Sequence, residues 1–505
     1  SDYIDFVTSV INLDANSKKN LNVLLRRIKK EENEVLIKTS NEINKKLEEF
    51  NNYIKGKKVA IIGLGVSNIP LIDELYKLGA NITLFNNKDV ENLDKTILDK
   101  IYEYKLKFFF GENYLNKLVG FDVIFRSPSC RPDTPQIEAE VKRGALLTSE
   151  IELVLEMCPG TTIGITGSDG KTTTTSLIYQ ILKEQGLNCY LGGNIGIPLF
   201  TKIKEMKPED YVVLELSSFQ LMTMKVSPQI AVITNVTPNH LDIHKSYDEY
   251  KEAKANIFKM QNESDLLVLN YDNDITRNFA KEAKGNVVYF SSKEKLDNGI
   301  ILDDGIIKDC ENGLRRHIVN TKNIKLRGVH NAENICAAVA ATKRFVSPEI
   351  QAKAVSEFSG VEHRLEFVKE INGAKWYNDS IASSPTRTIA GLNSFDENIV
   401  LIAGGYDKHL DYTPIAKPIV ENVGALILLG QTANKIYSAV TYELKFIKKD
   451  LPIYKVNTLE EAVNKAKEVS KKGDVVLFSP ASASFDMFKN FEERGNKFKQ
   501  IVNKL

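Results

Sequence analysis

The sequence predicts a three-domain α/β protein with mainly parallel sheets, in which the outer two domains are Rossmann-like. From about residue 57 to the C-terminus, short apolar strand patterns alternate with amphipathic helix patterns, which is typical of parallel sheets covered by helices. Two of the strands run into glycine-containing turns that lead directly into helices, near Gly63 and near Gly167. A chain of 505 residues, at about 100 to 200 residues per domain, corresponds to three or four domains.

The composition indicates a globular protein that acts on small molecules. Hydrophobic residues make up 43% of the chain and charged residues 26%, and the formal net charge is +1. Such a balance provides no basic field for nucleic acid. No apolar run approaches the roughly 18 residues that a membrane span needs. The five cysteines form no C-x-x-C pair, which favours a reduced compartment. We expect a cytoplasmic monomer that binds neither nucleic acid nor membrane.

Residues 1–50 form a charged extension in front of the first domain. They are rich in Lys, Glu and Asn, and apolar residues recur at helical spacing at Val23, Leu24 and Ile28. The segment carries no motif with a chemical function, so we expect a solvated helix. Two origins stay open, a native helical arm or an added segment.

The first domain, residues 51–150, opens with a strand and a glycine turn that partly match a dinucleotide-binding fingerprint. The turn contains Gly65, but Asn68 stands where a third glycine is expected. The next strand, 81–85, is followed by asparagines up to Asn87 and not by the acidic residue that would bind a ribose hydroxyl. The sequence therefore argues against NAD. The turn and the helix after it can still bind the diphosphate of another nucleotide.

The central domain, residues 151–358, contains the most informative stretch of the chain, Thr162–Thr173. An apolar strand enters a glycine-rich turn and leaves through Lys171 and Thr172 into a periodic helix. Backbone N–H groups of such a loop, a helix N-terminus and a lysine bind phosphates, and the threonine hydroxyl can reach a phosphate-bound Mg²⁺. The glycine spacing differs from the common Walker loop, so the pattern predicts a variant of it. The expected ATP contacts are Gly167, Ser168, Asp169, Gly170, Lys171, Thr172 and Thr173.

Two polar residues follow strands of the central domain. Glu215 follows the apolar strand 211–214, and His240 lies in the polar run after strand 230–233. Because ligands of open α/β sheets bind at the carboxyl ends of the strands, we expect both side chains to face the phosphates. A carboxylate in that position is a suitable Mg²⁺ ligand.

A lysine falls on the apolar side of a helix that begins at a capping box, Ser246–Glu249. Tyr250, Ala253 and Ile257 form the apolar stripe of this helix, and Lys254 follows Tyr250 by four residues on the same stripe. Burial lowers the pKa of an amine and makes its neutral form available for chemistry. Alternatively, the side chain bends so that its head reaches water. Periodicity alone leaves both interpretations open.

The last domain, residues 359–505, has the strand and helix alternation of a second doubly wound unit. Its expected strands are 399–403, 425–429 and 475–478, and helical patterns such as 459–470 separate them.

These motifs together resemble the Mur ligase family from about residue 57 to the C-terminus, and within it the ligases that add D-glutamate to UDP-N-acetylmuramoyl-L-alanine. The matching motifs are Thr166–Thr172, Gly193–Gly196, Glu215–Leu221, Asn239–Asp242, His330–Asn334, Glu362–Arg364, Asn378–Ser380, Ser479–Ser484 and Lys489–Glu492. The segment Glu-Leu-Ser-Ser-Phe-Gln-Leu at 215–221 separates this branch from relatives that use other amino acids.

The resemblance implies an ATP-dependent, ADP-forming amide ligase that acts through an acyl phosphate in a cytoplasmic step of peptidoglycan synthesis, and hence in cell-wall growth and division. It implies ATP and two Mg²⁺ ions, with metal contacts from Thr172, Glu215, His240 and a carbamylated Lys254. The catalytic residues that it implies are Lys171, Glu215, His240, Lys254, Arg364 and Lys408. Further ATP contacts would be Asn331, Asn334, Arg364 and Asp379. The first domain would bind the UDP substrate and the last would receive D-glutamate, with contacts from Gly65, Val66, Ser67, Asn87, Asn194, Ser217, Phe219, Ser383, Lys408, Ser484 and Phe491.

The chain departs from the family pattern at two positions. The family motif Asp-Ser-Lys ends here in Ile381, so a cation expected near the phosphate and the amino acid is missing, and Arg387 is a candidate to replace it. Ser129 stands where a glycine is usual after Ser-Pro in the first domain, which affects the expected uridine contacts. The alternatives are a folylpolyglutamate-type ligase, a Mur ligase for another amino acid, or a nucleotide-binding regulatory protein without ligase activity.

Overall fold

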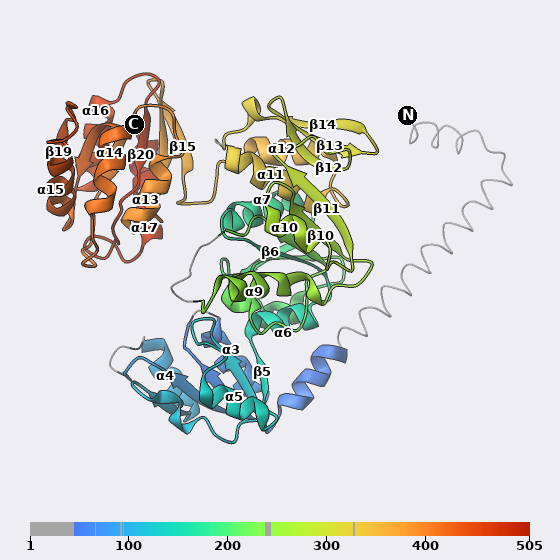
Figure 1. Ribbon diagram of the computed structural model, residues 1–505. Coiled ribbons are helices and arrows are strands. Elements are labelled where there is room, and N and C mark those ends of the chain that lie inside the picture. The colour runs from blue at the N-terminus through green and yellow to red at the C-terminus, as the bar shows by residue number, and fades with distance from the viewer. Residues whose placement is uncertain (1–44, 66, 91–92, 94, 238–243, 327–328) are drawn as a thin grey trace, which may run out of the picture. The chain divides into compact units, whose positions relative to one another are not determined.

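The computed structural model describes residues 45–65, 67–90, 93, 95–237, 244–326 and 329–505. Three sheets of five, nine and six strands follow one another along the chain (Figure 1). Helices alternate with the strands, so the predicted α/β class with mainly parallel sheets is confirmed. The predicted helical extension lies mostly outside the described residues, but residues 45–54 are helical and Phe50 contacts Phe200 edge-on at a ring-centroid distance of 5.8 Å.

The first sheet is parallel and has the strand order β3-β2-β1-β4-β5. Its strands are β1 (Lys58–Ile62), β2 (Asn81–Asn86), β3 (Lys107–Phe110), β4 (Val123–Arg126) and β5 (Leu146–Thr148). Its helices are α3 (Asn68–Lys77), α4 (Lys95–Tyr104) and α5 (Pro135–Lys142). The strand order reverses direction at β1, which lies between β2 and β4, and such a switch point is where open α/β sheets bind ligands.

The second sheet has the order β14-β13-β12-β11-β10-β9-β6-β8-β7. Its strands are β6 (Thr161–Thr166), β7 (Cys189–Gly193), β8 (Tyr211–Glu215), β9 (Ile230–Ile233), β10 (Leu266–Asn270), β11 (Asn286–Ser291), β12 (Gly299–Asp303), β13 (Ile306–Glu311) and β14 (Leu314–Asn320). Around β6 the pairing is parallel, whereas β12, β13 and β14 pair antiparallel, which the sequence interpretation did not foresee. Tight turns at Gly305 and Gly313, both with positive φ, connect these three strands.

Among the described residues, seven α-helices precede, separate or follow the strands of the second sheet in the sequence. They are α6 (Glu150–Met157), α7 (Lys171–Glu184), α8 (Ser218–Leu221), α9 (Tyr247–Lys259), α10 (Asp274–Phe279), α11 (Val329–Thr342) and α12 (Pro348–Glu357). The chain forms two compact units, and one of the crossings between them falls in the phosphate loop. The first unit runs to Ser168 and includes Gly186–Val268 and Asn278–Val287, and the second comprises Asp169–Gln185, Leu269–Arg277 and Val288–Leu505.

The third sheet has the order β15-β16-β20-β17-β18-β19 and is parallel apart from β15, which pairs antiparallel with β16. Its strands are β15 (Glu366–Ile371), β16 (Ala374–Asn378), β17 (Ile399–Ala403), β18 (Val423–Leu428), β19 (Ile453–Lys455) and β20 (Val475–Phe478). Its helices are α13 (Pro385–Leu392), α14 (Ala416–Asn422), α15 (Ala433–Glu443), α16 (Leu459–Val469) and α17 (Phe491–Asn503).

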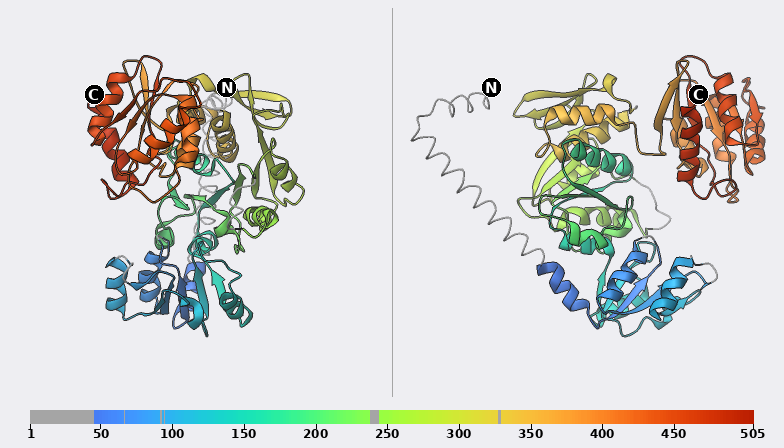
Figure 2. Two further views of the ribbon diagram at one scale, coloured as in Figure 1. Left: turned by 60° about the vertical axis from the view of Figure 1, so that its left-hand side comes forward. Right: turned by 180° about the vertical axis from the view of Figure 1, so that it is seen from behind.

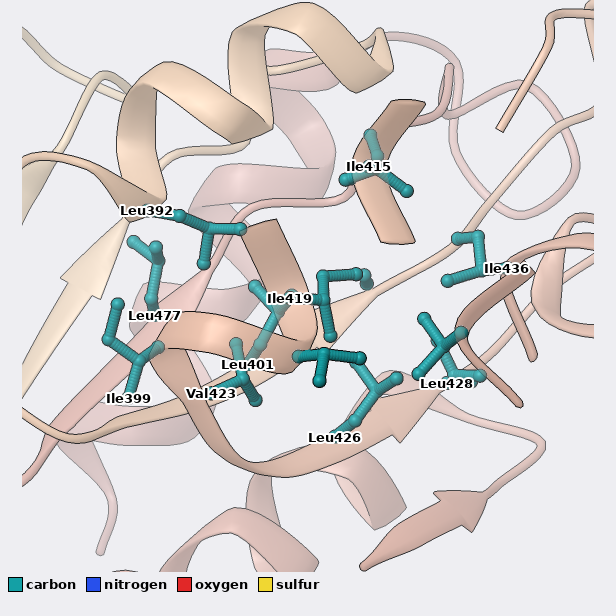
Figure 3. Packing of buried hydrophobic residues seen from close by; sticks show 14 of the residues in the cluster. Leu392, Ile399, Leu401, Ile415, Ile419, Val423, Leu426, Leu428, Ile436 and Leu477 are labelled. Carbon is teal, nitrogen blue, oxygen red and sulfur yellow. The ribbon is translucent and has the colours of Figure 1, made fainter. Parts of the chain in front are cut away.

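Helices cover both faces of the third sheet (Figure 2). On one face, Leu401 of β17 packs with residues of α13, α14 and α15, including Leu392, Ile419 and Ile436 (Figure 3). On the other face, Ile402 packs with residues of α16 and α17, including Phe498. Neighbouring residues of one buried strand therefore belong to two separate cores, which explains its unbroken apolar sequence. Within the described ranges, no helix has the length and apolar character of a membrane span.

Candidate functional site

The first half of the phosphate loop packs too closely on β9 and α9 for any residue but glycine at Gly167. This glycine has φ +155°, and a Cβ built on it would lie 1.8 Å from Thr234 Oγ1. Ser168 Oγ lies 2.9 Å from the Tyr250 hydroxyl and accepts a 2.9 Å hydrogen bond from the Thr237 N–H. The loop therefore leaves β6 in a conformation that its neighbours fix, as a preformed phosphate cradle requires.

The second half of the loop begins helix α7. Gly170 occupies the N-cap in a left-handed conformation, with φ +78°, and a Cβ on this residue would clash with Asn334 Oδ1 at 2.2 Å. Thr174 Oγ1 donates to the same Asn334 Oδ1 at 3.3 Å, and Asn334 Nδ2 donates to Asn331 Oδ1 at 3.3 Å. The first backbone N–H groups of α7 have no partner within an ideal helix, so this end is suited to bind an anion. The structure thus places Asn334 against the loop and Asn331 beside Asn334.

Glu215 combines burial with an oxygen that lacks a protein partner. The side chain lies at the end of β8, is 1% exposed, and accepts a 2.9 Å hydrogen bond from Asn194 Nδ2 at Oε1. Across the part of the chain that the structure describes, no group bonds its buried Oε2. A buried carboxylate oxygen in this state is costly unless a cation or another donor binds it. The other predicted metal ligand, His240, lies outside the described residues.

Lys254 is buried beside the phosphate loop. Its side chain is on the buried face of α9 with Tyr250, Ala253 and Ile257, and the residue is 1% exposed. Nζ donates to the Gly167 carbonyl at 2.7 Å and lies 4.6 Å from the centre of the Tyr250 ring. The predicted apolar-face position is confirmed, and the alternative in which the amine reaches water is wrong. The capping-box prediction is half right, because Ser246 accepts from the Glu249 N–H while the Glu249 carboxylate accepts from the Lys245 N–H.

The turn of the first sheet explains Asn68. This residue begins α3, is 3% exposed, and its Nδ2 donates to the carbonyls of Ile62 and Gly63 at 3.2 and 2.8 Å. The asparagine therefore ties the turn to β1 with its side chain. Of the expected substrate contacts here, Ser67 and Asn87 lie after β1 and β2, with Asn87 exposed. Gly65 is in the same turn, and Val66 lies outside the described residues.

Three predicted residues, Asn194, Ser217 and Phe219, lie around the end of β8. Besides Asn194, which bonds Glu215, Ser217 caps α8 by accepting from the Gln220 N–H at 3.2 Å. The Phe219 ring stacks on His244 at 4.7 Å with an angle of 16°. The carboxyl end of β8 therefore carries the buried carboxylate of Glu215, and the stacked rings of Phe219 and His244 lie in the segments that follow.

Asp379 is a buried carboxyl at the end of β16. It is 4% exposed and accepts hydrogen bonds from Ser479 Oγ at 2.7 Å and from the Leu365 N–H at 3.2 Å. Burial raises the pKa of Asp379 to about 7, although these two bonds and the charges of Arg364 and Arg387 oppose the rise. The exposed Arg387 donates from Nη1 to the Ile381 carbonyl at 3.2 Å, so it lies beside the position where the family lysine is missing.

Arg494 is a buried residue of α17 that the sequence interpretation missed. It is 2% exposed, and its guanidinium donates to Ser380 Oγ, the Ser380 carbonyl and the carbonyls of Ser482 and Ala483 at 2.8 to 3.0 Å. Ser380 Oγ in turn donates to the Phe491 carbonyl at 2.8 Å. Burial lowers the pKa of Arg494 to about 10. Its position on the buried face of a helix that starts at Asn490 was the only available sequence signal.

The same loops carry the residues expected to receive an amino acid. Ser484 is 2% exposed and follows the segment that Arg494 holds. Phe491 lies at the start of α17 and contacts the His363 ring edge-on at 6.0 Å. Lys408 Nζ lies 5.5 Å from the centre of the exposed Phe485 ring, and Ser383 lies in the turn between β16 and α13.

A variant phosphate loop in a sheet that is parallel around β6, together with two further doubly wound sheets, defines a multidomain nucleotide-binding α/β protein. Residues 165–342 match the family model of the Mur ligase middle domain, and residues 363–482 match that of the Mur ligase glutamate ligase domain. A protein of Acetivibrio thermocellus named UDP-N-acetylmuramoylalanine–D-glutamate ligase is 54% identical over 465 residues, which are 92% of this chain and all of that protein. The chain belongs to the Mur ligase family.

Two solved structures share the fold at low sequence identity. UDP-N-acetylmuramate-alanine ligase MurC from Thermotoga maritima is 19% identical with a TM-score of 0.52, and the match covers 89% of this chain and 99% of that one. MurF ligase from Thermotoga maritima, solved in complex with ADP, is 19% identical with a TM-score of 0.50, over 90% of this chain and 97% of that one.

Proposed function

We propose that this chain joins D-glutamate to UDP-N-acetylmuramoyl-L-alanine with hydrolysis of ATP to ADP and phosphate. The observation that carries this proposal is the 54% identity to a ligase of that name, which the alignment covers from end to end. The L-alanyl carboxylate attacks the γ-phosphate and forms an acyl phosphate while ADP leaves. The D-glutamate amine then attacks the carbonyl carbon, phosphate leaves, and the amine gives up a proton as the amide forms. The reaction is a cytoplasmic step of peptidoglycan synthesis.

The phosphate loop is the proposed site of the ATP phosphates. Lys171 offsets negative charge on the transferred group, and the N-terminus of α7 contributes its backbone N–H groups. Gly167, Ser168, Asp169, Gly170, Thr172 and Thr173 complete the loop, and Asn331, Asn334, Arg364 and Asp379 are the proposed further contacts of the nucleotide. The geometry around Gly170 supports this assignment, because Asn334 lies against the loop and leaves no room for a side chain.

We assign two Mg²⁺ ions to the region around the end of β8, where Glu215 is the described residue that supports a cation. The buried Oε2 of Glu215 needs a cation or a donor, and we assign the hydroxyl of Thr172, in the first turn of α7, as a further oxygen ligand. We assign His240 and a carbamylated Lys254 as further ligands, since a carbamate would place an anionic oxygen at the end of the buried Lys254 stem. When bound, Mg²⁺ supplies positive charge that offsets the charge of the transferred phosphoryl group.

The three domains have separate proposed roles. Residues 51–150 bind the UDP group through Gly65, Val66, Ser67 and Asn87, and residues 151–358 bind ATP. Asn194, Ser217 and Phe219 line the path of the muramoyl-alanyl end. Residues 359–505 receive D-glutamate through Ser383, Lys408, Ser484 and Phe491. The positive charges of Lys408 and Arg364 lie near the γ-phosphate and the D-glutamate in this assignment. Excluding water from the site matters, because an acyl phosphate hydrolyses.

Phosphate release from ATP tests the proposal. We expect release only when UDP-N-acetylmuramoyl-L-alanine and D-glutamate are both present, together with a product whose mass equals the sum of the two substrates minus water. Replacement of D-glutamate by L-glutamate, glycine or a folate substrate is the specificity control. Turnover with any of these and none with D-glutamate would contradict the proposal. The Lys171→Ala variant should lose turnover while retaining its circular dichroism spectrum.

A further inference from the structure

Arg126 joins the first sheet to the segment that carries Phe219. It is the last residue of β4 and is 2% exposed. Its Nη2 donates to the Phe219 carbonyl at 2.7 Å and to Thr223 Oγ1 at 3.2 Å, while Nη1 donates to the Cys130 carbonyl at 2.8 Å. The hydrogen bonds found for this guanidinium within the described ranges thus go to neutral oxygens. Burying a charged guanidinium without an anionic partner is costly. The arginine is therefore explained by the several hydrogen bonds that its side chain donates to separate acceptors, and not by an ion pair.

Arg131 is connected to the same segment indirectly, through Glu249 and His244. It lies in the turn after β4, and its Nη2 forms an ion pair with Glu249 Oε1 at 2.6 Å. The Glu249 carboxylate lies 3.5 Å from His244 Nδ1, and His244 Nε2 lies 2.9 Å from Ser218 Oγ. The His244 ring stacks on the Phe219 ring. One arginine therefore donates to the backbone of Phe219, and the other pairs with Glu249, whose carboxylate lies beside the His244 ring on which Phe219 stacks, although no hydrogen bond to His244 Nδ1 is found among the described residues.

We propose that Arg126 and Arg131 form a two-point clamp that positions Phe219 for binding of the UDP-sugar substrate. The inference rests on the proposed function, because UDP-N-acetylmuramoyl-L-alanine is its ligand. Arg126 ends the strand β4, which borders the switch point of the first sheet, and Arg131 lies in the turn after it. Phe219 lies four residues after Glu215, which ends β8 of the second sheet. The clamp thus links the carboxyl ends of the first-sheet strands, where we propose that the UDP group binds, with the carboxyl end of β8, where we propose that the L-alanyl carboxylate reacts. Arg126 and Arg131 are positioning residues in this scheme, since they act through Phe219.

Two conservative substitutions loosen the clamp at its two ends. Arg126→Lys keeps the positive charge but loses the planar fork that bonds separate acceptors. Glu249→Gln keeps an oxygen for the Lys245 N–H but weakens the bond to Arg131. We expect each to raise the KM for UDP-N-acetylmuramoyl-L-alanine about tenfold, the usual size for a lost charge-assisted hydrogen bond, while the KM values for ATP and D-glutamate stay within about twofold.

The chain supplies a matched control for each substitution. Arg143, at the end of α5, bonds Glu140 and the Phe121 carbonyl within the first domain, so Arg143→Lys makes the same chemical change away from Phe219. Glu252 is exposed on the same helix as Glu249 and pairs with Lys259, so Glu252→Gln is the second control. Both should leave all three KM values unchanged. Calorimetric titration of each protein with the UDP substrate, without ATP, provides a readout that is independent of turnover.

A Phe219→Leu background tests whether the arginines act through this ring. We expect Arg126→Lys to add less than about twofold to the KM of Phe219→Leu, because residues that act through one another are not additive. Additive effects would overturn the clamp, as would equal losses for all three substrates or a KM for the UDP substrate that neither Arg126→Lys nor Glu249→Gln changes. A wild-type protein that forms no product from UDP-N-acetylmuramoyl-L-alanine and D-glutamate would instead refute the proposed function, and the two failures are therefore distinguishable.

Discussion

Replacing Asp379 by asparagine removes a carboxyl group whose protonation differs between the folded and the unfolded chain. Between about pH 4 and pH 7 this group is protonated in the folded protein and ionised in the unfolded chain. Its pKa rises from the ordinary 3.8 to about 7 because of burial. At about 1.4 kcal/mol per pH unit, this rise corresponds to roughly 4 kcal/mol at most. The folded state binds more protons than the unfolded state between these two pKa values. The wild type should therefore lose stability relative to Asp379→Asn as the pH rises from about 4 to about 7, and the difference should level off above that.

Tryptophan fluorescence offers a direct assay of this prediction. The chain has a single tryptophan, Trp376, which is fully buried in β16 three residues before Asp379. Its signal during urea unfolding therefore follows the domain in question, even if the other domains unfold separately. Asparagine preserves the shape and can still accept from the Leu365 N–H and bond Ser479 Oγ. We expect the unfolding free energy of Asp379→Asn minus that of wild type to increase by a few kcal/mol between pH 5 and pH 8.

A control of opposite sign lies in the same domain. The pKa of the exposed Asp411 is lowered by hydrogen bonds from the Thr413 N–H and hydroxyl, so its stabilising effect is present above about pH 4 and is lost only at lower pH. Asp411→Asn should therefore change stability by an amount that is constant between pH 5 and pH 8. A free-energy difference for Asp379→Asn that is equally flat, or that falls as the pH rises, would refute the assigned protonation of Asp379.

Three further substitutions test the site. Gly170→Ala should reduce kcat/KM for ATP at least about tenfold, because a Cβ would overlap Asn334 Oδ1. Gly186→Ala is the kinetic control, since Gly186 has a similar positive φ but open space around it. Lys254→Ala should be inactive and partly rescued by short carboxylic acids, and full activity without them would contradict the carbamate assignment. Arg387→Ala should lower kcat/KM for D-glutamate or ATP if it replaces the cation missing at Ile381, and wild-type values would exclude that role.

The fold and much of the loop could be predicted from local patterns, because their causes are local in the sequence. Period-two and period-3.6 patterns predicted the α/β class, and the glycines with Lys171 and Thr172 predicted the loop. Periodicity placed Lys254 on the apolar stripe of its helix but left open whether its amine is buried, and the structure shows that it is. The antiparallel strands β12, β13 and β14 were not foreseen, since short apolar strands with glycine turns also fit the parallel pattern that precedes them.

Arg126 and Arg494 were beyond sequence reasoning for a different physical reason. Both donate mainly to backbone carbonyls, at Phe219 and Cys130 in one case and at Ser380, Ser482 and Ala483 in the other. Every residue has a carbonyl, so no residue type in the sequence marks the acceptor, and only the folded chain brings it within reach.

Arg126 and Arg494 both lie next to segments that we assign to substrate binding. Each is buried and fixes the backbone of a segment whose neighbouring side chains are assigned to the substrates, Phe219 in one case and Ser484 in the other. A loop, like the last turn of a short helix such as α8, leaves backbone carbonyls without helical or strand partners, so it needs other partners to keep one conformation. A planar guanidinium supplies several such bonds from a single side chain. Buried arginines that donate to such carbonyls therefore mark the two segments that we assign to substrate binding.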